Sequence, residues 1–186
     1  LEVIRYVQRG GYDLLIKMAH APAGISEKLF GSVDLHLLRK CPCPVLIDRP
    51  SASNRYQRIL AAVDTDSSPA EGCDELVMQL ASSFKERENA QLDIVHAWHL
   101  PGESMFRSPR FSVPFDEIEA MLKNEKDKQM DKLKVLLKPY NIDVNDKRIH
   151  LVKGQPAESI NLVSKQCDSD IIVMGTVARV GIPGLF

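Results

Sequence analysis

Polar residues and glycines follow apolar segments at several places in the chain, and these positions could hold a ligand. Asp64 follows the apolar segment 58–63, and Gly175 follows another such segment near the end of the chain. Two more apolar segments lead into residues 97–99 and 152–155. If these segments are strands of a parallel sheet, their carboxyl ends meet at one edge, where such sheets bind ligands. The pattern therefore predicts a binding site at that edge.

Other residue patterns in the sequence do not indicate catalysis or a metal. His96 and His99 are spaced as in some metal sites, but residues three apart on a strand point to opposite faces, and zinc needs about three or four converging ligands. The sequence contains no P-loop and no G-x-S-x-G motif, and no spacing of Ser, His and Asp indicates a triad. We therefore expect no catalytic residues and no protein-bound metal.

Alternating strands and helices are predicted to position the binding residues. In the second part of the chain, the expected strands are 58–63, 92–98, 148–152 and 170–175. The expected helices start at Ser68-Pro69 and continue to Phe84, and then cover 117–137 and 155–166. This alternation predicts an α/β fold with an open parallel sheet flanked by helices.

The first part of the chain shows the same alternation. The expected elements are a helix at 1–8, a strand at 13–18, a helix at 31–39 and a strand at 43–47. Lys17 lies in an otherwise apolar strand, so its amine either extends to the strand end or pairs with a carboxylate, and we favour the first. A polar run rich in helix breakers predicts a boundary, giving domains at 1–50 and 58–186 with the linker 51–57 between them.

The two parts of the chain also resemble each other. The segment 13–21 aligns without a gap on 170–178, and Gly24 then aligns with Gly181. A self-match of this kind indicates one domain-sized unit used twice, a tandem repeat. We therefore expect the chain to begin near the end of one unit and to stop before the last helix and strand of the second.

At these residues the sequence resembles the universal stress protein family. The segment 173–176, followed by Arg179 and Gly181, is similar to the family pattern V-M-G-T-x-G-R-x-G, and the run 35–47 resembles the family's final helix and strand. The two-unit layout is similar to that of the tandem E-type members. This resemblance implies a Rossmann-like fold of the adenine nucleotide alpha hydrolase type, and a cytoplasmic protein made under stress.

The resemblance also implies an adenine-nucleotide site, for ATP or AMP with its associated Mg²⁺, in the second unit. Family members use glycines that let backbone amides approach phosphates beside a helix N-terminus. The implied contacts are Asp64 to the nucleoside, Ala97 to the adenine, and Gly175, Thr176, Ala178, Arg179 and Gly181 around the phosphates. Ala178 replaces the second glycine of the family motif, and the third glycine would follow Phe186.

The first unit departs further from the family motif. Met18 and Ala21 stand at the first two glycine positions, and only Gly31-Ser32 appears at the family spacing. We therefore expect no phosphate site there, but a pocket that is closed or shaped for an apolar ligand.

Composition limits the partners. The net charge of −1 and the pI near 6.6 give no electrostatic basis for binding nucleic acid, and no apolar run approaches the ~20 residues of a membrane span. The cysteines form no disulfide framework and are expected to be reduced, which fits a cytoplasmic location. The cysteines are Cys41, Cys43, Cys73 and Cys167. The partners that remain after these exclusions are the nucleotide and a second unit, which would pair either in a homodimer or in a pseudo-dimer within one chain.

Together these features predict a stress-response protein that binds a nucleotide and acts by regulation. Three alternatives stay open. The chain could carry or sense a more apolar ligand, held under the long segment 101–114. It could be a slow ATPase or a nucleotidyl transferase, or a pure assembly protein whose pockets bind nothing.

Overall fold

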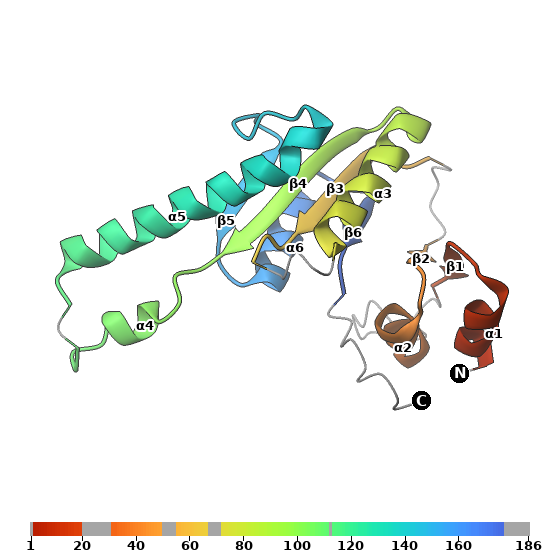
Figure 1. Cartoon of the computed structure of the whole chain (residues 1–186), viewed down its shortest axis with the longest axis horizontal. Helices are drawn as coiled ribbons and strands as arrows, with labels where there is room; N and C mark the ends of the chain where they lie inside the picture. Colours follow the sequence, from red (N-terminus) through yellow and green to blue (C-terminus); the bar gives the residue numbers. More distant parts are fainter. Residues whose placement is uncertain (1, 20–30, 50–54, 67–71, 112, 177–186) are drawn as a thin grey trace. The chain divides into compact units, whose positions relative to one another are not determined.

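The computed structural model describes residues 2–19, 31–49, 55–66, 72–111 and 113–176. The described residues form two compact units, one within the first 54 residues and the other spanning Arg55–Gly175. Both units are shown in Figure 1. Apart from the helix predicted to end at Phe84, which continues to Glu88, every predicted strand and helix lies within two residues of an observed one at each described end.

The described residues of the first unit form two parallel strands and two helices. Its elements in chain order are α1 (Glu2–Gly10), β1 (Leu15–Met18), α2 (Ser32–Lys40) and β2 (Val45–Asp48). Strand β1 pairs in parallel with β2, with Leu15 opposite Val45. The amine of Lys17 pairs with the buried carboxylate of Asp34 in α2, at 2.5 Å between Nζ and Oδ1. The same amine donates to the carbonyl oxygen of Met18, the last residue of β1, at 3.0 Å. Lys17 therefore both reaches the strand end, as we favoured, and pairs with a carboxylate, which was the alternative.

The second unit is built on a four-stranded parallel sheet with the order β5-β4-β3-β6. Its strands are β3 (Arg58–Val63), β4 (Gln91–Trp98), β5 (Ile149–Lys153) and β6 (Ile171–Met174). Five of the six residues of β3 are buried. This explains why every residue of β3 after Arg58 is apolar, since both faces of a parallel sheet are covered by helices.

Three helices pack on this sheet. They are α3 (Cys73–Glu88), α5 (Phe115–Leu137) and α6 (Pro156–Gln166). Helix α3 packs mainly on β3 and β6, α5 contacts β4, and α6 packs on β4 and β5. Leu60, Ala62 and Val95 form a buried cluster with Val163 of α6. His96, which directly follows Val95 in β4, faces α5 instead. Alternation along the strands therefore places α6 on one face and α5 on the other.

The structure contains two elements that the sequence analysis did not predict, and the first lies in the segment after β4. A short helix, α4 (Glu103–Phe106), forms there, and a single 3₁₀ turn, Lys138–Tyr140, follows α5. Figure 1 shows α4 and the start of α5 beyond the carboxyl end of β4. Glu103 accepts hydrogen bonds from Lys153 at 2.8 Å and from Arg107 at 2.9 Å. Side-chain bonds thus tie this segment to the end of β5.

None of the described helices is both long enough and apolar enough to cross a membrane.

Candidate functional site

Three of the predicted nucleotide contacts lie at one edge of the four-stranded sheet. The last residue pairs of β3 with β4 and of β3 with β6 come directly before Asp64, Ala97 and Gly175. The strand register thus places these three residues at the carboxyl edge, as the sequence predicts. Thr176 follows Gly175 and is the last described residue. The other predicted contacts, Ala178, Arg179 and Gly181, lie outside the described residues, as do the expected helix-start residues Ser68 and Pro69.

Asp64 begins an ordered turn at the end of β3. Its backbone N–H donates to Oδ1 of Asp74 in the first turn of α3 at 2.9 Å, and its own Oδ1 accepts from the N–H of Asp66 at 3.2 Å. The second bond is an Asx turn, in which a side chain holds the backbone two residues on. The Asp64 side chain is exposed. A carboxylate is therefore presented at the sheet edge on a backbone that is already fixed.

Gly175 lies close to the start of α3. A Cβ placed on Gly175 would lie 2.5 Å from Sγ of Cys73, closer than real Cβ contacts come. A side chain at this position would require the side chain of Cys73 to move, independently of any ligand. Gly175 can be interpreted both as a structural turn residue and as a phosphate contact. Both interpretations depend on the absence of a side chain at this position.

A buried polar network lies beneath this edge, on the α5 face of the sheet. The His96 side chain is fully buried, with Nδ1 at 3.1 Å from the carbonyl oxygen of Val63 and Nε2 at 3.1 Å from Oε1 of Gln129. The hydroxyl of Thr65 lies 3.2 Å from the same Nε2. Sequence analysis considered His96 only as a metal ligand, and it missed Gln129, which a helical pattern treats as a surface residue.

The orientation of the Gln129 amide follows from its neighbours. Its Nε2 donates to Oδ2 of Asp66 at 3.0 Å and to Oε1 of Glu125 at 2.7 Å. The amide oxygen is thereby turned toward Nε2 of His96. An amide oxygen only accepts hydrogen bonds, and the Thr65 hydroxyl, 3.3 Å away, also donates to it. The network connects the interior of the sheet to two carboxylates at the surface.

Asp66 is the charged group at the outer end of this network. Lys132 of α5 forms an ion pair with its carboxylate. Burial raises the pKa of Asp66, but the hydrogen bonds from Lys132 and Gln129 outweigh that effect and hold the pKa below its usual value. In contrast, burial raises the pKa of Asp74. His99 is exposed while His96 is buried, so the two histidines do not face a common site.

An open hollow lies beside α4, away from the residues of the sheet edge. Its volume is about 460 Å³, and its lining is Phe106, Arg107, Ser108, Pro109, Val113, Phe115 and Ile118. The guanidinium carbon of Arg107 lies 5.9 Å from the centre of the Phe115 ring. Most of the lining is apolar and comes from the segment expected to cover an apolar ligand.

The first unit differs from a phosphate site at the start of α2. The backbone N–H of Gly31 donates to Oδ2 of Asp34 at 3.1 Å. This carboxylate occupies a donor that a phosphate would otherwise use at a helix N-terminus. Met18 is 62% exposed and Ala21 lies outside the described residues, so the expectation of a closed or apolar pocket stays a prediction.

Comparison with known proteins identifies the family of the chain's relatives. The sequence pattern of the universal stress protein family matches residues 1–49 and 55–186. Universal stress protein E of Escherichia coli K12 is 27% identical over 187 residues, which cover 99% of this chain and 57% of that protein. The protein of that name from Salmonella typhi is 29% identical, over 99% of this chain and 58% of its own length. The chain thus spans little more than half the length of these relatives.

Solved structures show the same fold. A functionally unknown protein from Pseudomonas aeruginosa PAO1 matches with a TM-score of 0.71 at 23% identity, over 98% of this chain and 59% of that one. A putative universal stress protein from Pseudomonas aeruginosa UCBPP-PA14 gives a TM-score of 0.70 at 24% identity, with the same coverage. With parallel sheets flanked by helices and a family pattern that matches nearly every residue, the chain belongs to the universal stress protein family.

Proposed function

We propose that this chain acts in the stress response by binding an adenine nucleotide, ATP or AMP, at the carboxyl edge of its four-stranded sheet. Membership of the family supports the stress-response role. The observation that carries the proposed site is the strand register, which brings Asp64, Ala97 and Gly175 to one edge. Ligands of open parallel sheets bind at such edges.

The described part of the edge suits the nucleoside end of the ligand. Asp64 presents an exposed carboxylate that can accept hydrogen bonds from ribose hydroxyls, and Ala97 can offer backbone groups to the adenine. Thr176, Ala178, Arg179 and Gly181 would lie around the phosphates, with Mg²⁺ carried by the nucleotide.

A titration of the purified chain with ATP and with AMP tests this site. Asp64→Ala is expected to weaken binding about tenfold or more, because it removes a charged hydrogen-bond acceptor. Asp143→Ala is the matched control, since Asp143 is also exposed and also accepts the N–H of the residue two positions on, Asn145, at 2.9 Å. Equal affinity in both variants, or no binding by the wild type, would refute the proposed site.

The proposed role is regulatory, with the bound nucleotide changing the surface offered to partners. A slow ATPase is the enzymatic alternative. Release of phosphate from ATP under saturating conditions, abolished by Asp64→Ala and retained by Asp143→Ala, would favour turnover over regulation.

The hollow beside α4 favours a second candidate function, the carriage of an apolar ligand. A fluorescent apolar probe that binds wild type but not Phe106→Asp, while ATP fails to compete, would assign ligand binding to this hollow. Phe111→Asp is a suitable control, because Phe111 is 51% exposed and does not line the hollow.

We also propose that the two units belong to a tandem pair of family domains, and that they replace the dimer of single-domain members. Sedimentation equilibrium of the full-length protein tests this arrangement: a monomer supports the pseudo-dimer, and a tight dimer of chains argues against it.

A further inference from the structure

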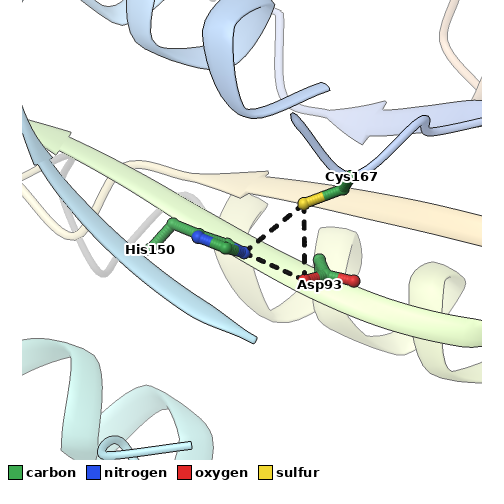
Figure 2. A group of neighbouring side chains, drawn as sticks. All are labelled: Asp93, His150 and Cys167. Carbon is green, nitrogen blue, oxygen red and sulfur yellow. Dashed lines mark hydrogen bonds and ion pairs between the residues drawn. The ribbon is translucent and has the colours of Figure 1, made fainter. Parts of the chain in front are cut away.

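Three side chains with different donor atoms converge on the α6 face of the sheet. Asp93 belongs to β4, His150 to β5, and Cys167 directly follows α6. Figure 2 shows the three side chains pointing toward one another. Nε2 of His150 lies 2.9 Å from Oδ1 of Asp93, and Sγ of Cys167 lies 3.5 Å from that oxygen and 3.6 Å from that nitrogen. One sulfur, one nitrogen and one oxygen thus surround a single point.

The sheet register creates this convergence from positions far apart in the sequence. Val95 pairs with His150 on the neighbouring strand, and Asp93 precedes Val95 by two residues, so all three face α6. Asp93 is only 3% exposed, on a face that is otherwise largely apolar. A buried carboxylate is costly unless it is paired or coordinates a metal.

The surroundings of Asp93 direct one oxygen toward the other two donors. Nε2 of Gln91 donates to Oδ2 of Asp93 at 2.7 Å. This bond leaves Oδ1 facing His150 and Cys167. Groups that hydrogen-bond a ligating carboxylate in this way fix its orientation and raise metal affinity.

The distances between the donors fit a tetrahedral zinc ion. Ordinary Zn–S, Zn–N and Zn–O bonds of ~2.3, ~2.05 and ~2.0 Å give edges of about 3.5–3.6 Å from sulfur to the other donors and about 3.3 Å from nitrogen to oxygen. The observed sulfur distances are 3.5 and 3.6 Å, and the nitrogen–oxygen distance is 2.9 Å. The site therefore needs only one edge to lengthen, by about 0.4 Å, where a hydrogen bond now joins His150 and Asp93.

We propose that Asp93, His150 and Cys167 form a binding site for Zn²⁺, with water as the fourth ligand. A donor set of thiolate, imidazole and carboxylate favours zinc over Ca²⁺ or Mg²⁺, which prefer oxygen alone. The His150 side chain is 23% exposed, and Cys167 is partly exposed, so an ion and a water molecule can reach the cluster. The site would join β4, β5 and the end of α6. It does not depend on the proposed nucleotide site, which lies at the carboxyl edge of the sheet.

Cobalt is the probe for this site, because Co²⁺ takes the place of Zn²⁺ and gives an absorption band when a thiolate binds it. The other cysteines must first be removed, since the Sγ atoms of Cys41 and Cys43 lie 3.7 Å apart and would compete for the metal ion. The experiment therefore titrates Co²⁺ into the reduced full chain carrying Cys41→Ser, Cys43→Ser and Cys73→Ser, in which Cys167 is the one remaining thiol. We expect a thiolate–cobalt band at one Co²⁺ per chain, which Zn²⁺ abolishes.

Variants of the cluster identify the ligands. Adding Cys167→Ser should remove the band, and adding His150→Gln or Asp93→Asn should weaken Co²⁺ and Zn²⁺ binding by about a hundredfold or more. Gln91→Ala should weaken it by roughly tenfold, as loss of an outer-shell hydrogen bond does. Circular dichroism checks that each variant is folded. The proposal fails if the three-serine chain gives no thiolate band while folded, or if its band survives both His150→Gln and Asp93→Asn.

Discussion

Gln129 is the residue that joins the interior of the sheet to the surface at the candidate site. Its amide bonds to His96 within the sheet and to Asp66 and Glu125 outside it. Gln129 is 1% exposed, although the charged residues of the same helix lie at the surface. A buried amide of this kind is stabilising because every one of its polar atoms has a partner.

Replacing Gln129 should therefore destabilise the second unit. We expect Gln129→Ala to lower the free energy of unfolding by about 2–3 kcal/mol, since the buried side chain of His96 loses a hydrogen-bond partner. Gln79→Ala is the control: Gln79 is also in a helix but is exposed, so its replacement should change the free energy by less than about 0.5 kcal/mol. Urea unfolding followed by circular dichroism measures both. Equal small effects would mean that the network contributes nothing to stability.

Asp66 should make stability depend on pH in the acid range. Burial opposes its ionisation, but the hydrogen bonds from Lys132 and Gln129 prevail, so its pKa is lower in the folded chain than in the unfolded one. Such a group stabilises the fold above its unfolded pKa of about 3.9, and this contribution is lost as the pH falls toward the folded value.

The comparison of wild type with Asp66→Asn isolates this effect. The difference between their free energies of unfolding should be constant from about pH 5 to 7 and should shrink steadily below about pH 4. Urea titrations across this range measure it. A difference that grows as the pH falls would contradict the assigned direction of the pKa.

The residues that sequence analysis missed share one property. Gln129 meets His96 only because α5 packs on β4, and Asp93 meets His150 only because two strands pair. Within each pair, the spacing along the chain follows no fixed pattern, so the sequence alone does not link the two residues. Asp64 and Gly175 could be predicted because each follows an apolar strand directly, and that relation is visible in the sequence.

At the scale of elements, the contact between β6 and α3 is the one that constrains the site. Gly175→Ala should destabilise the second unit by about 1–3 kcal/mol, as overpacking does, because its Cβ would lie 2.5 Å from Sγ of Cys73. Cys73→Ala removes that sulfur, so the double variant should recover most of the loss. Thermal or urea unfolding of the four chains in this cycle gives the coupling energy. Additive effects would show that the two residues do not meet.

Helix α4 should depend on the ion pairs that Glu103 forms with Lys153 of β5 and with Arg107. Glu103→Gln is expected to speed amide hydrogen exchange in α4 and to leave exchange in β3 unchanged, because Lys153 and Arg107 both donate to Glu103. The global free energy of unfolding should change by less than about 1 kcal/mol. Glu119→Gln serves as the control, since Glu119 has a longer contact with Arg107, at 3.5 Å, and is 50% exposed. Equal exchange in both variants would argue against anchoring by Glu103.

The positions of the elements could be predicted better than the faces they bury. The apolar residues that follow one another at helical spacing in α3 include Leu76, which is 45% exposed, while Met78, which lies outside that spacing, is fully buried. Apolar residues occur on more than one side of this helix, so periodicity alone does not select the side that meets the sheet. For β3 no such choice exists, because both faces are covered and every residue after Arg58 is apolar.

At the scale of the molecule, the fold and the family are established, and the nucleotide is the proposal. The chain matches the family pattern over nearly its whole length while spanning 57% of the Escherichia coli protein. Asp64, Ala97 and Gly175 all belong to the second unit. The central claim is therefore that a nucleotide binds at this edge.

The most direct test is to record the amide NMR spectrum of the labelled chain while AMP and then ATP are added. We predict saturable shifts of the amides of Thr65, Trp98 and Gly175, which lie at the carboxyl edge, and none for Asp146 and Arg148, which lie before β5 at the opposite edge. Shifts confined to the hollow of Phe106 and Phe115, or no shifts at all, would contradict the proposed nucleotide site.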